Sequence, residues 1–267
     1  MSRPYVTTPT GVQTSIPYEI GVAAGLVPGH TRIAGLGFNP SVTTSGNQDI
    51  WSGGGLYPFQ TTAQTLEIVS ASANDTAAGT GARTVSLLLL DANYNPVTVT
   101  VTLNGTTPVT VTDGPYIRVN LMQVATAGSG QTNAGNITLR VAGAGATQGV
   151  ILAGATIAQS SIFTVPAGFT MFVTKFVYNI VDNAATANYV TIATVINQQP
   201  TGNPAALLAT QRFVITQQAQ VPFELSAPFP IIVAEKQDLI LRKTAINTTL
   251  PITAMWQGVI CNNKVLL

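Results

Sequence analysis

The sequence predicts an all-β protein made of two antiparallel β-sandwich domains, jelly-roll-like in type, preceded by an extended N-terminal arm. Apolar residues alternate strictly with threonine in residues 97–103, and a period of two places alternate side chains on the same face of a sheet. Turn residues (Gly, Pro, Asn and Asp) separate such runs at short intervals. A long amphipathic helix pattern is absent from the sequence. Together these observations favour strands over helices throughout.

Residues 1–48 are expected to form the arm, with short strands at most. Prolines recur there with Gly and Thr, and the apolar residues follow no period. A segment without its own core must lie on another surface, and two surfaces are open: its own sandwich or a partner chain. The predicted contact residues of the arm, toward a capsid or a second subunit, are Tyr5, Val6, Tyr18 and Ile20.

The first sandwich domain is expected over residues 49–145. It begins with an aromatic cluster, Trp51, Tyr57 and Phe59, around three glycines. This cluster is interpreted either as a loop that plugs the open end of the sandwich or as a contact surface, for a carbohydrate or another subunit. The plug is the preferred interpretation.

Consecutive antiparallel strands, a β-meander, are predicted between Thr65 and Thr112. The connection at residues 91–96 ends in Pro96, which has no amide proton and interrupts a strand. Asn104-Gly105 is a strong hairpin signal because both residues tolerate a positive φ. Two further strands are expected at residues 116–124 and 136–141.

The second sandwich domain is expected over residues 146–267, after a Gly-rich boundary at residues 143–149. The Gly-rich segment has the wrong spacing for a nucleotide-binding loop, so a connector is the preferred interpretation. The strand-like runs of this domain are residues 161–178 (two strands around Val-Pro-Ala-Gly), 189–196, 209–216, 221–225, 231–243 and 252–261.

Composition limits the classes of function that we expect for this protein. Charged residues make up 8% of the 267 residues and the net charge is +1, which provides no field for nucleic acid or an anionic membrane. The first residues lack the apolar segment of a secretory signal, the single cysteine leaves no internal disulfide, and no run of 18 apolar residues exists. We therefore expect a protein made in a reducing host cytosol that leaves the cell as part of a virion.

Catalytic and metal-binding patterns are weak. His30 is the one imidazole, and no Gly-x-Ser-x-Gly elbow accompanies it that would indicate a serine triad. Cys261 lies near the end of an apolar run that is expected to be a buried strand. Asp91, Asn93 and Asn95 match the first ligand positions of a calcium loop, but Pro96 occupies the position of its glycine. Turn formation by Asp and Asn is the preferred interpretation. We expect no enzyme activity, no cofactor and no bound metal.

Residues 65–83, 90–95 and 101–105, together with 163–168 and 235–242, resemble a recurrent module of tailed-bacteriophage virion proteins. The resemblance covers most of residues 50–260 and lies in strands and turns. It implies a capsid decoration (cement) protein or a head or tail fibre component, built from β-sandwiches and often trimeric. The implied partners are the major capsid protein and further copies of the same chain, on the capsid exterior.

Three hypotheses follow. The first is a decoration protein that stabilises a capsid shell. The second is a fibre that binds host-surface glycans through exposed aromatic residues such as Trp51, Tyr57 and Tyr94. The third, a polysaccharide-degrading enzyme, has no positive feature in the sequence.

Overall fold

The structure is a computed structural model of the chain and describes residues 5–7, 13–180, 188–197, 207–217 and 223–265. Within these ranges the regular structure is almost entirely β. The helical elements there are α1 (Tyr18–Ala23) and a short 3-10 turn, η2 (Asn263–Val265). The prediction of an all-β chain is therefore confirmed.

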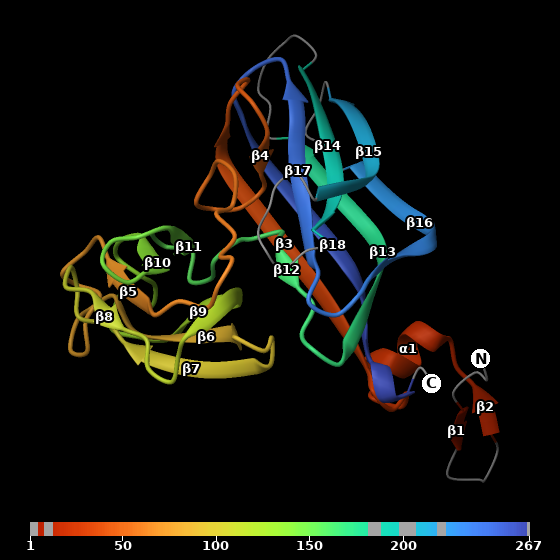
Figure 1. Cartoon of the computed structure of the whole chain (residues 1–267), viewed down its shortest axis with the longest axis horizontal. Helices are drawn as coiled ribbons and strands as arrows, with labels where there is room; N and C mark the ends of the chain where they lie inside the picture. The colour runs from red at the N-terminus through yellow and green to blue at the C-terminus, as the bar shows by residue number, and fades with distance from the viewer. Residues whose placement is uncertain (1–4, 8–12, 181–187, 198–206, 218–222, 266–267) are drawn as a thin grey trace.

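Figure 1 shows most strands gathered in two lobes. The larger lobe, here called the main module, comprises residues 30–49 and 162–262. It consists of two antiparallel sheets, one in the order β16-β13-β18-β3 and one in the order β12-β17-β14-β15 with β4 also paired to β17. Its strands are β3 (His30–Val42), β4 (Gln48–Asp49), β12 (Phe163–Thr164), β13 (Phe169–Ile180), β14 (Asn188–Asn197), β15 (Leu207–Gln217), β16 (Phe223–Val233), β17 (Asp238–Ile246) and β18 (Leu250–Asn262).

One hydrophobic core fills the space between these two sheets. Phe176 and Trp256 extend into it from one sheet, and Ile192 and Leu241 from the other, all with almost no exposed surface. Buried and partly exposed residues alternate along most of β18, so one face of the strand packs in the core. Burial of these side chains is the main source of the stability of the main module.

One strand of the main module is interrupted. β4 pairs with residues 242–243 of β17, and β12 pairs with residues 238–239 of the same strand in the same antiparallel sense. The two short strands therefore follow one another along one edge of β17, as two halves of a single strand. Between them the chain leaves the sheet at Ile50 and returns at Ser161.

The inserted module, residues 53–158, lies between these two halves. It also has two antiparallel sheets, in the orders β11-β10-β5-β8 and β7-β6-β9, with a separate hydrophobic core between them. Its strands are β5 (Leu66–Ser70), β6 (Ala82–Asp91), β7 (Pro96–Thr102), β8 (Val109–Thr110), β9 (Tyr116–Ala127), β10 (Ile137–Val141) and β11 (Thr147–Ile151).

The N-terminal segment differs from the predicted arm. β1 (Tyr5–Thr7) and β2 (Gln13–Ser15) form a small hairpin beside α1, apart from both modules in Figure 1. β3, however, is a 13-residue strand that pairs with β18 along most of its length. The expectation of short strands at most in residues 1–48 is therefore wrong for β3.

Two glycines explain both the close packing of β3 and why the sequence did not reveal it. A Cβ atom at Gly35 would lie 2.5 Å from the Trp256 ring, and one at Gly37 would lie 2.2 Å from the carbonyl oxygen of Ile50. Glycine in a strand allows such close approach. The same two glycines break the apolar alternation that identifies a strand in a sequence.

Two further expectations need correction. Residues 143–149 lie in the turn between β10 and β11 and in the first part of β11, and the two strands pair with each other. The module boundary therefore lies at the return point near Ser161. β6 and β7 form the expected hairpin around residues 91–96, but β5 and β8 belong to the opposite sheet. The meander is therefore wrong, and Asn104-Gly105 turns the chain from one sheet to the other.

Candidate functional site at the junction of the two modules

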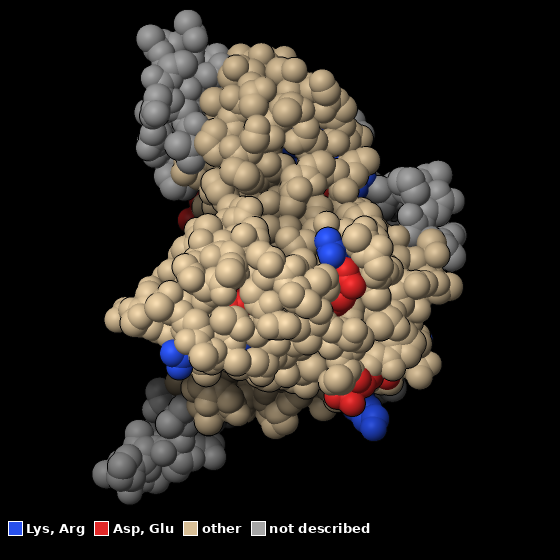
Figure 2. Space-filling model, turned by 90° about the vertical axis from the view of Figure 1, so that its left-hand side faces the viewer, with Lys and Arg blue, Asp and Glu red and all other residues tan. Residues whose placement is uncertain are grey.

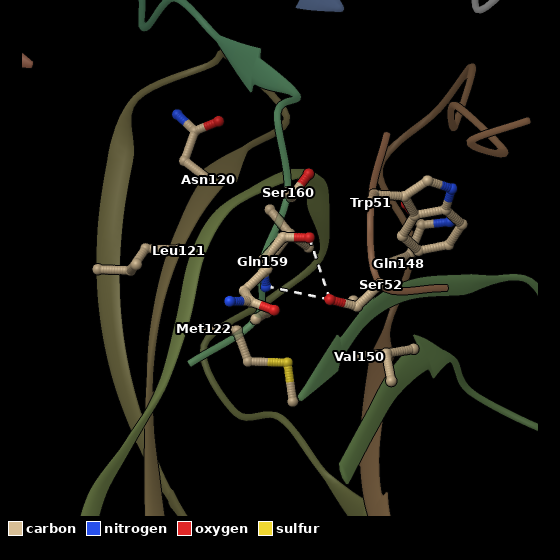
Figure 3. Close-up of a pocket in the computed structure, with 12 residues that line it drawn as sticks. Trp51, Ser52, Asn120, Leu121, Met122, Gln148, Val150, Gln159 and Ser160 are labelled. Atoms are coloured by element: carbon tan, nitrogen blue, oxygen red, sulfur yellow. Dashed lines mark hydrogen bonds between the residues drawn. The ribbon is translucent and has the colours of Figure 1, made fainter. Parts of the chain in front are cut away.

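The two chain crossings between the modules form a short antiparallel pair, which we call the neck (residues 50–52 and 159–161). The amide and hydroxyl of Ser161 both donate to the carbonyl oxygen of Ile50, at 3.0 and 2.8 Å. The amide of Ser52 donates to the carbonyl oxygen of Gln159 at 3.0 Å, and the Ser52 hydroxyl bonds both backbone groups of Gln159. Figure 3 shows this last pair of hydrogen bonds. The neck is thus a fixed two-stranded connection.

A small cavity of about 20 Å³ lies beside the neck (Figure 3). Its walls come from Trp51 and Ser52, from residues 119–122 of β9, from residues 148–150 of β11 and from residues 158–160. A cavity of this size has room for about one water molecule. The junction is therefore a packed contact, too small to admit a substrate or cofactor.

A buried ion pair crosses the junction. Arg118 on β9 of the inserted module binds Asp238 at the start of β17 through two hydrogen bonds, Nε to Oδ1 at 2.9 Å and Nη2 to Oδ2 at 3.1 Å. The two side chains are 1% and 0% exposed. Arg118 also donates to the carbonyl oxygens of Gln60 and Ile117. A planar guanidinium with this many acceptors fixes both distance and orientation.

Aromatic rings surround the same guanidinium. Its Cζ atom lies 5.1 Å from the ring centre of Phe59 and 5.8 Å from that of Tyr94. Burial lowers the pKa of Arg118, but the Asp238 carboxylate raises it, and the net shift is upward. Arg118 therefore remains protonated at any physiological pH.

Polar bonds from a neighbouring pair of residues complete the contact. Asn120 on β9 and Thr164 on β12 bond reciprocally: the Asn120 amide donates to the Thr164 carbonyl at 2.8 Å and accepts its N–H at 2.9 Å. The Thr164 hydroxyl donates to Asp238 Oδ1 at 2.5 Å. Arg118, Asp238, Asn120 and Thr164 thus form one hydrogen-bond network that both modules share, and it fixes their relative position.

A second buried ion pair lies on the main-module side of the neck. Arg242 on β17 bonds both carboxylate oxygens of Asp49 on β4, at 2.5 and 3.1 Å. Asp49 also accepts the backbone N–H of Tyr57 at 2.8 Å, so this pair holds the first residues of the inserted module. Removal of one partner of such a pair would leave an unpaired buried charge.

The predicted aromatic contact surface is not exposed. Trp51 and Tyr57 are 3% and 6% exposed, and their rings pack edge to face at 5.0 Å. The Tyr57 hydroxyl donates to the Gln148 carbonyl at 3.0 Å. Tyr94 is also buried, and Phe59 is half-buried. Trp51, Tyr57 and Tyr94 are therefore too buried to serve as a glycan-stacking surface. The plug interpretation stays a prediction.

The four predicted arm contacts are not brought together as one patch. The side chains of Tyr5 and Val6 lie outside the described part of the structure, which gives only the backbone pairing of β1. Tyr18 is half-buried and its ring meets the His30 ring edge-on at 6.0 Å, whereas Ile20 is 57% exposed. Their contact with a capsid or another subunit stays a prediction.

His30 and Cys261 are register partners on β3 and β18. His30 Nδ1 lies 2.8 Å from the carbonyl oxygen of Pro28. Cys261 is buried, and burial raises the pKa of its thiol, which disfavours the reactive thiolate.

The Asp91 carboxylate serves its own turn. It accepts the backbone N–H groups of Asn93 and Asn95 at 2.8 and 2.9 Å, as the turn interpretation predicts. Within the described ranges, no three His, Cys, Asp or Glu side chains lie close enough together to hold a metal ion. The helices of that same part of the chain are all too short to cross a bilayer.

Sequence reasoning missed Arg118, Asp238, Asp49 and Arg242 because their partners are distant in the chain. A usable signal exists. Charged residues are rare in this sequence, and Arg118 and Arg242 both interrupt apolar strand-like runs. Where both faces of such a strand are covered, the charged side chain is buried and needs a partner.

Comparison with known proteins gives little further information. No family model matches the chain, and no curated protein matches it. A solved structure of infectious bursal disease virus (Gt strain) is 8% identical, with 92% of this chain and 78% of that chain covered and a TM-score of 0.22. VP17, a capsid protein of bacteriophage P23-77, is 10% identical over 86% of this chain and 96% of that one, with a TM-score of 0.17. TM-scores at this level do not establish a shared fold.

Proposed function

We propose that the protein is a non-enzymatic structural component of a virion. The observation that carries this proposal is the strand order of the main module. Followed along the chain, β3 lies in one sheet, the β4/β12 strand in the other, β13 in the first, β14 and β15 in the second, β16 in the first, β17 in the second and β18 in the first.

This order is the one expected of an eight-stranded jelly roll, if the β4/β12 strand is counted as one. Jelly rolls form viral capsid domains as well as lectins and cupins, so strand order alone leaves several functions open. The inserted module has a different strand order. Two jelly-roll-like sandwiches are predicted from the sequence. We therefore propose a jelly roll for the main module alone.

Surface chemistry favours the virion among these functions. With 8% charged residues and a net charge of +1, copies of the chain repel one another little. Leu36 on β3 and Ile232 on β16 are 43% and 58% exposed, so large apolar side chains lie on both edge strands of one sheet. These features suit a subunit whose neighbours are further copies of itself, including the homotrimer that the sequence resemblance implies.

Two positions in a virion are compatible with this surface. A decoration protein binds the outside of a shell that another protein has formed, and a shell subunit forms the wall itself. The jelly-roll order favours a shell subunit, because the main module then forms the wall while the inserted module projects from it. The decoration role depended on a long detached arm, and β3 removes residues 30–42 from that arm.

The test is assembly of the purified full-length protein, measured by sedimentation velocity and negative-stain electron microscopy. Closed particles or lattice fragments formed by the protein alone would support a shell subunit. Small oligomers that bind only to preformed phage capsids would support a decoration protein. A monomer that neither assembles nor binds capsids would contradict the virion proposal.

A further inference from the structure

β7 (Pro96–Thr102) is the last strand of its three-stranded sheet, and no described strand pairs with its outer side. Figure 1 shows it at the margin of the smaller lobe. The outer side of an edge strand presents backbone N–H and C=O groups that another strand can bind. Proteins usually protect such an edge with a charged residue, a proline or an irregularity in the pairing.

β7 lacks this protection. Residues 97–102 contain neither a charged residue nor a proline, and β7 pairs with β6 without any shift of register. Every other described edge strand of more than five residues has a register shift in its pairing and contains a charged residue: Arg32 in β3, Arg118 in β9, Arg212 in β15 and Glu224 in β16. An unprotected edge in a chain that protects its other long edges indicates that this edge is used for pairing.

The hydrogen bonds to β6 show which groups of β7 point outward. The Asp91 amide donates to the Asn95 carbonyl at 3.0 Å, and the Leu103 amide donates to the Arg83 carbonyl at 2.9 Å. In an antiparallel pair, residues that bond the neighbouring strand alternate with residues that point away from it. Because the register between these two bonds is regular, residues 97, 99 and 101 bond β6. The N–H and C=O groups of the three threonines, at residues 98, 100 and 102, therefore point to the free edge.

The free edge has a defined length. It begins at Pro96, where the turn from β6 ends and where a proline, which has no N–H, is tolerated because its nitrogen faces outward. Past Leu103, Asn104 forms an isolated antiparallel bridge with Thr76, so another part of the chain already lies beside it there. A partner strand must therefore be about as short as β7, and a second copy of β7 has that length.

The pattern of β7 also matches itself. The midpoint of the free edge is Val99, and a two-fold axis there places Thr98 beside Thr100 of the second copy. Both threonines have outward N–H and C=O groups, so the antiparallel pair exchanges hydrogen bonds in both directions. On the inner face, Val97 then lies beside Val101 of the second copy, and the half-buried surface of Val97 becomes covered.

Charge does not oppose this contact. Figure 2 shows the face of the molecule on which the inserted module lies, and charged atoms are few and scattered over it. Like charges that lie directly opposite one another destabilise a pair of strands, and β7 has no charged residue.

We propose that two copies of the chain pair antiparallel along β7, so that their three-stranded sheets join into one continuous sheet. The contact goes beyond the proposed function, because it forms whether or not the main module builds a shell. It uses the inserted module and leaves the surface of the main module free for other copies.

The first test is hydrogen exchange of the full-length protein at two concentrations that differ about a hundredfold. In the single chain the amides of Thr98, Thr100 and Thr102 face solvent, whereas those of Val99 and Val101 bond β6. We expect exchange of the three threonine amides to slow by about tenfold or more at the higher concentration. Exchange of the two valine amides should change much less.

Charge exchange tests the register of the pairing. Thr98→Lys with Thr100→Lys places like charges opposite one another across the axis, and so does Thr98→Glu with Thr100→Glu. Both positions are exposed, so each double variant should keep its melting temperature while its dimer is lost in sedimentation equilibrium. An equimolar mixture of the two double variants should recover the dimer, since each lysine then faces a glutamate.

The matched control is Gln123→Lys with Ala125→Lys, at exposed positions on β9 at the other edge of the same sheet. This variant should associate like the natural chain.

Fast exchange of the threonine amides at both concentrations would overturn the proposal. So would a dimer that both charged double variants retain, or a mixture of them that fails to associate. Particles formed by the full chain while these amides exchange fast would contradict this contact and leave the virion proposal standing. Slow exchange of these amides in a dimer that forms no particles would support the contact and count against the shell role.

Discussion

The two modules are both two-sheet β structures with separate cores, but they are held together differently. The main module relies on long strands: β3 and β18 each span 13 residues and pair with one another along most of that length. The inserted module has several short strands and long connections, and polar side chains bond to the backbone of those connections. Apolar burial therefore dominates in the main module, and side-chain hydrogen bonds carry a larger share of the stability in the inserted one.

Asp75 shows the second kind of stabilisation most clearly. Its carboxylate accepts four hydrogen bonds: from the Ser70 hydroxyl at 2.6 Å and from the backbone N–H groups of Ala82, Ala134 and Gly135 at 2.7, 2.8 and 2.9 Å. These donors come from the end of β5, the start of β6 and the loop before β10. One carboxylate thus joins the neighbouring ends of β5 and β10, in one sheet, to the start of β6 in the other sheet.

The largest effect is expected from separating the two modules. Arg118→Met removes the cation from a buried pair, leaves Asp238 unpaired, and should lower the free energy of unfolding by about 3–5 kcal/mol. Because Arg118 joins the modules, calorimetry should resolve two melting transitions in the variant, whereas we expect a single one for the natural chain. Arg118→Met combined with Asp238→Leu should recover part of the loss. A single transition in Arg118→Met at an unchanged temperature would show that the pair does not couple the modules.

A smaller effect, confined to the inserted module, is expected from Asp75→Asn. The amide has one acceptor oxygen where the carboxylate has two, and its NH₂ group would face N–H donors. We expect a loss of about 3 kcal/mol. Hydrogen exchange should become faster in β5, β6 and β10 and stay unchanged in β13 and β18. Equal acceleration in both modules would contradict the separation of their cores.

The smallest effect is a dependence on pH that belongs to the inserted module. Burial raises the pKa of Asp75, but its four hydrogen bonds lower it, and the net shift is below the ordinary value of 3.8. Backbone hydrogen bonds from Gly143 and Ala144, together with Arg140, lower the pKa of Glu67. A carboxyl group whose pKa is lower in the folded state stabilises the fold above its unfolded pKa. That contribution is lost as the pH falls through the folded pKa.

Acidification from about pH 5 to about pH 3 should therefore lower the melting temperature of the inserted module first. In Arg118→Met, where the two transitions are separate, calorimetry at several pH values would assign the shift to one of them. A shift confined to the main-module transition would contradict the assignment.

How far the sequence predicts this structure also differs between the modules. The period-two run at residues 97–103 predicts β7, and the turn ending in Pro96 predicts its hairpin with β6, because both signals are local. Sheet membership is not local: the strands before and after that hairpin join the opposite sheet, and nothing in their own residues indicates it. The sequence does not predict β3 because Gly35 and Gly37 interrupt its apolar alternation. Glycine is required at these positions by close contacts with Trp256 and Ile50, which lie outside β3.

The interrupted strand was beyond sequence reasoning for the same reason. Each half, β4 and β12, has two residues, too few to show a period. Only their common partner β17 identifies them as one strand. The same limit applies to predicting the candidate site at the junction. Arg118 and Asp238 can each be recognised in the sequence as an unusual charge, but not as a pair.

We propose that the main module is a complete jelly roll into which the other module is inserted. The most direct test replaces residues 53–158 with Asn-Gly, a two-residue turn suited to the antiparallel neck between Ser52 and Gln159. Asp238 then becomes exposed to solvent and no longer needs Arg118. We predict a folded β protein by circular dichroism, with one cooperative melting transition and the same assembly state as the full chain by sedimentation velocity. An unfolded or aggregated product, with the full-length chain folded under the same conditions, would contradict the claim.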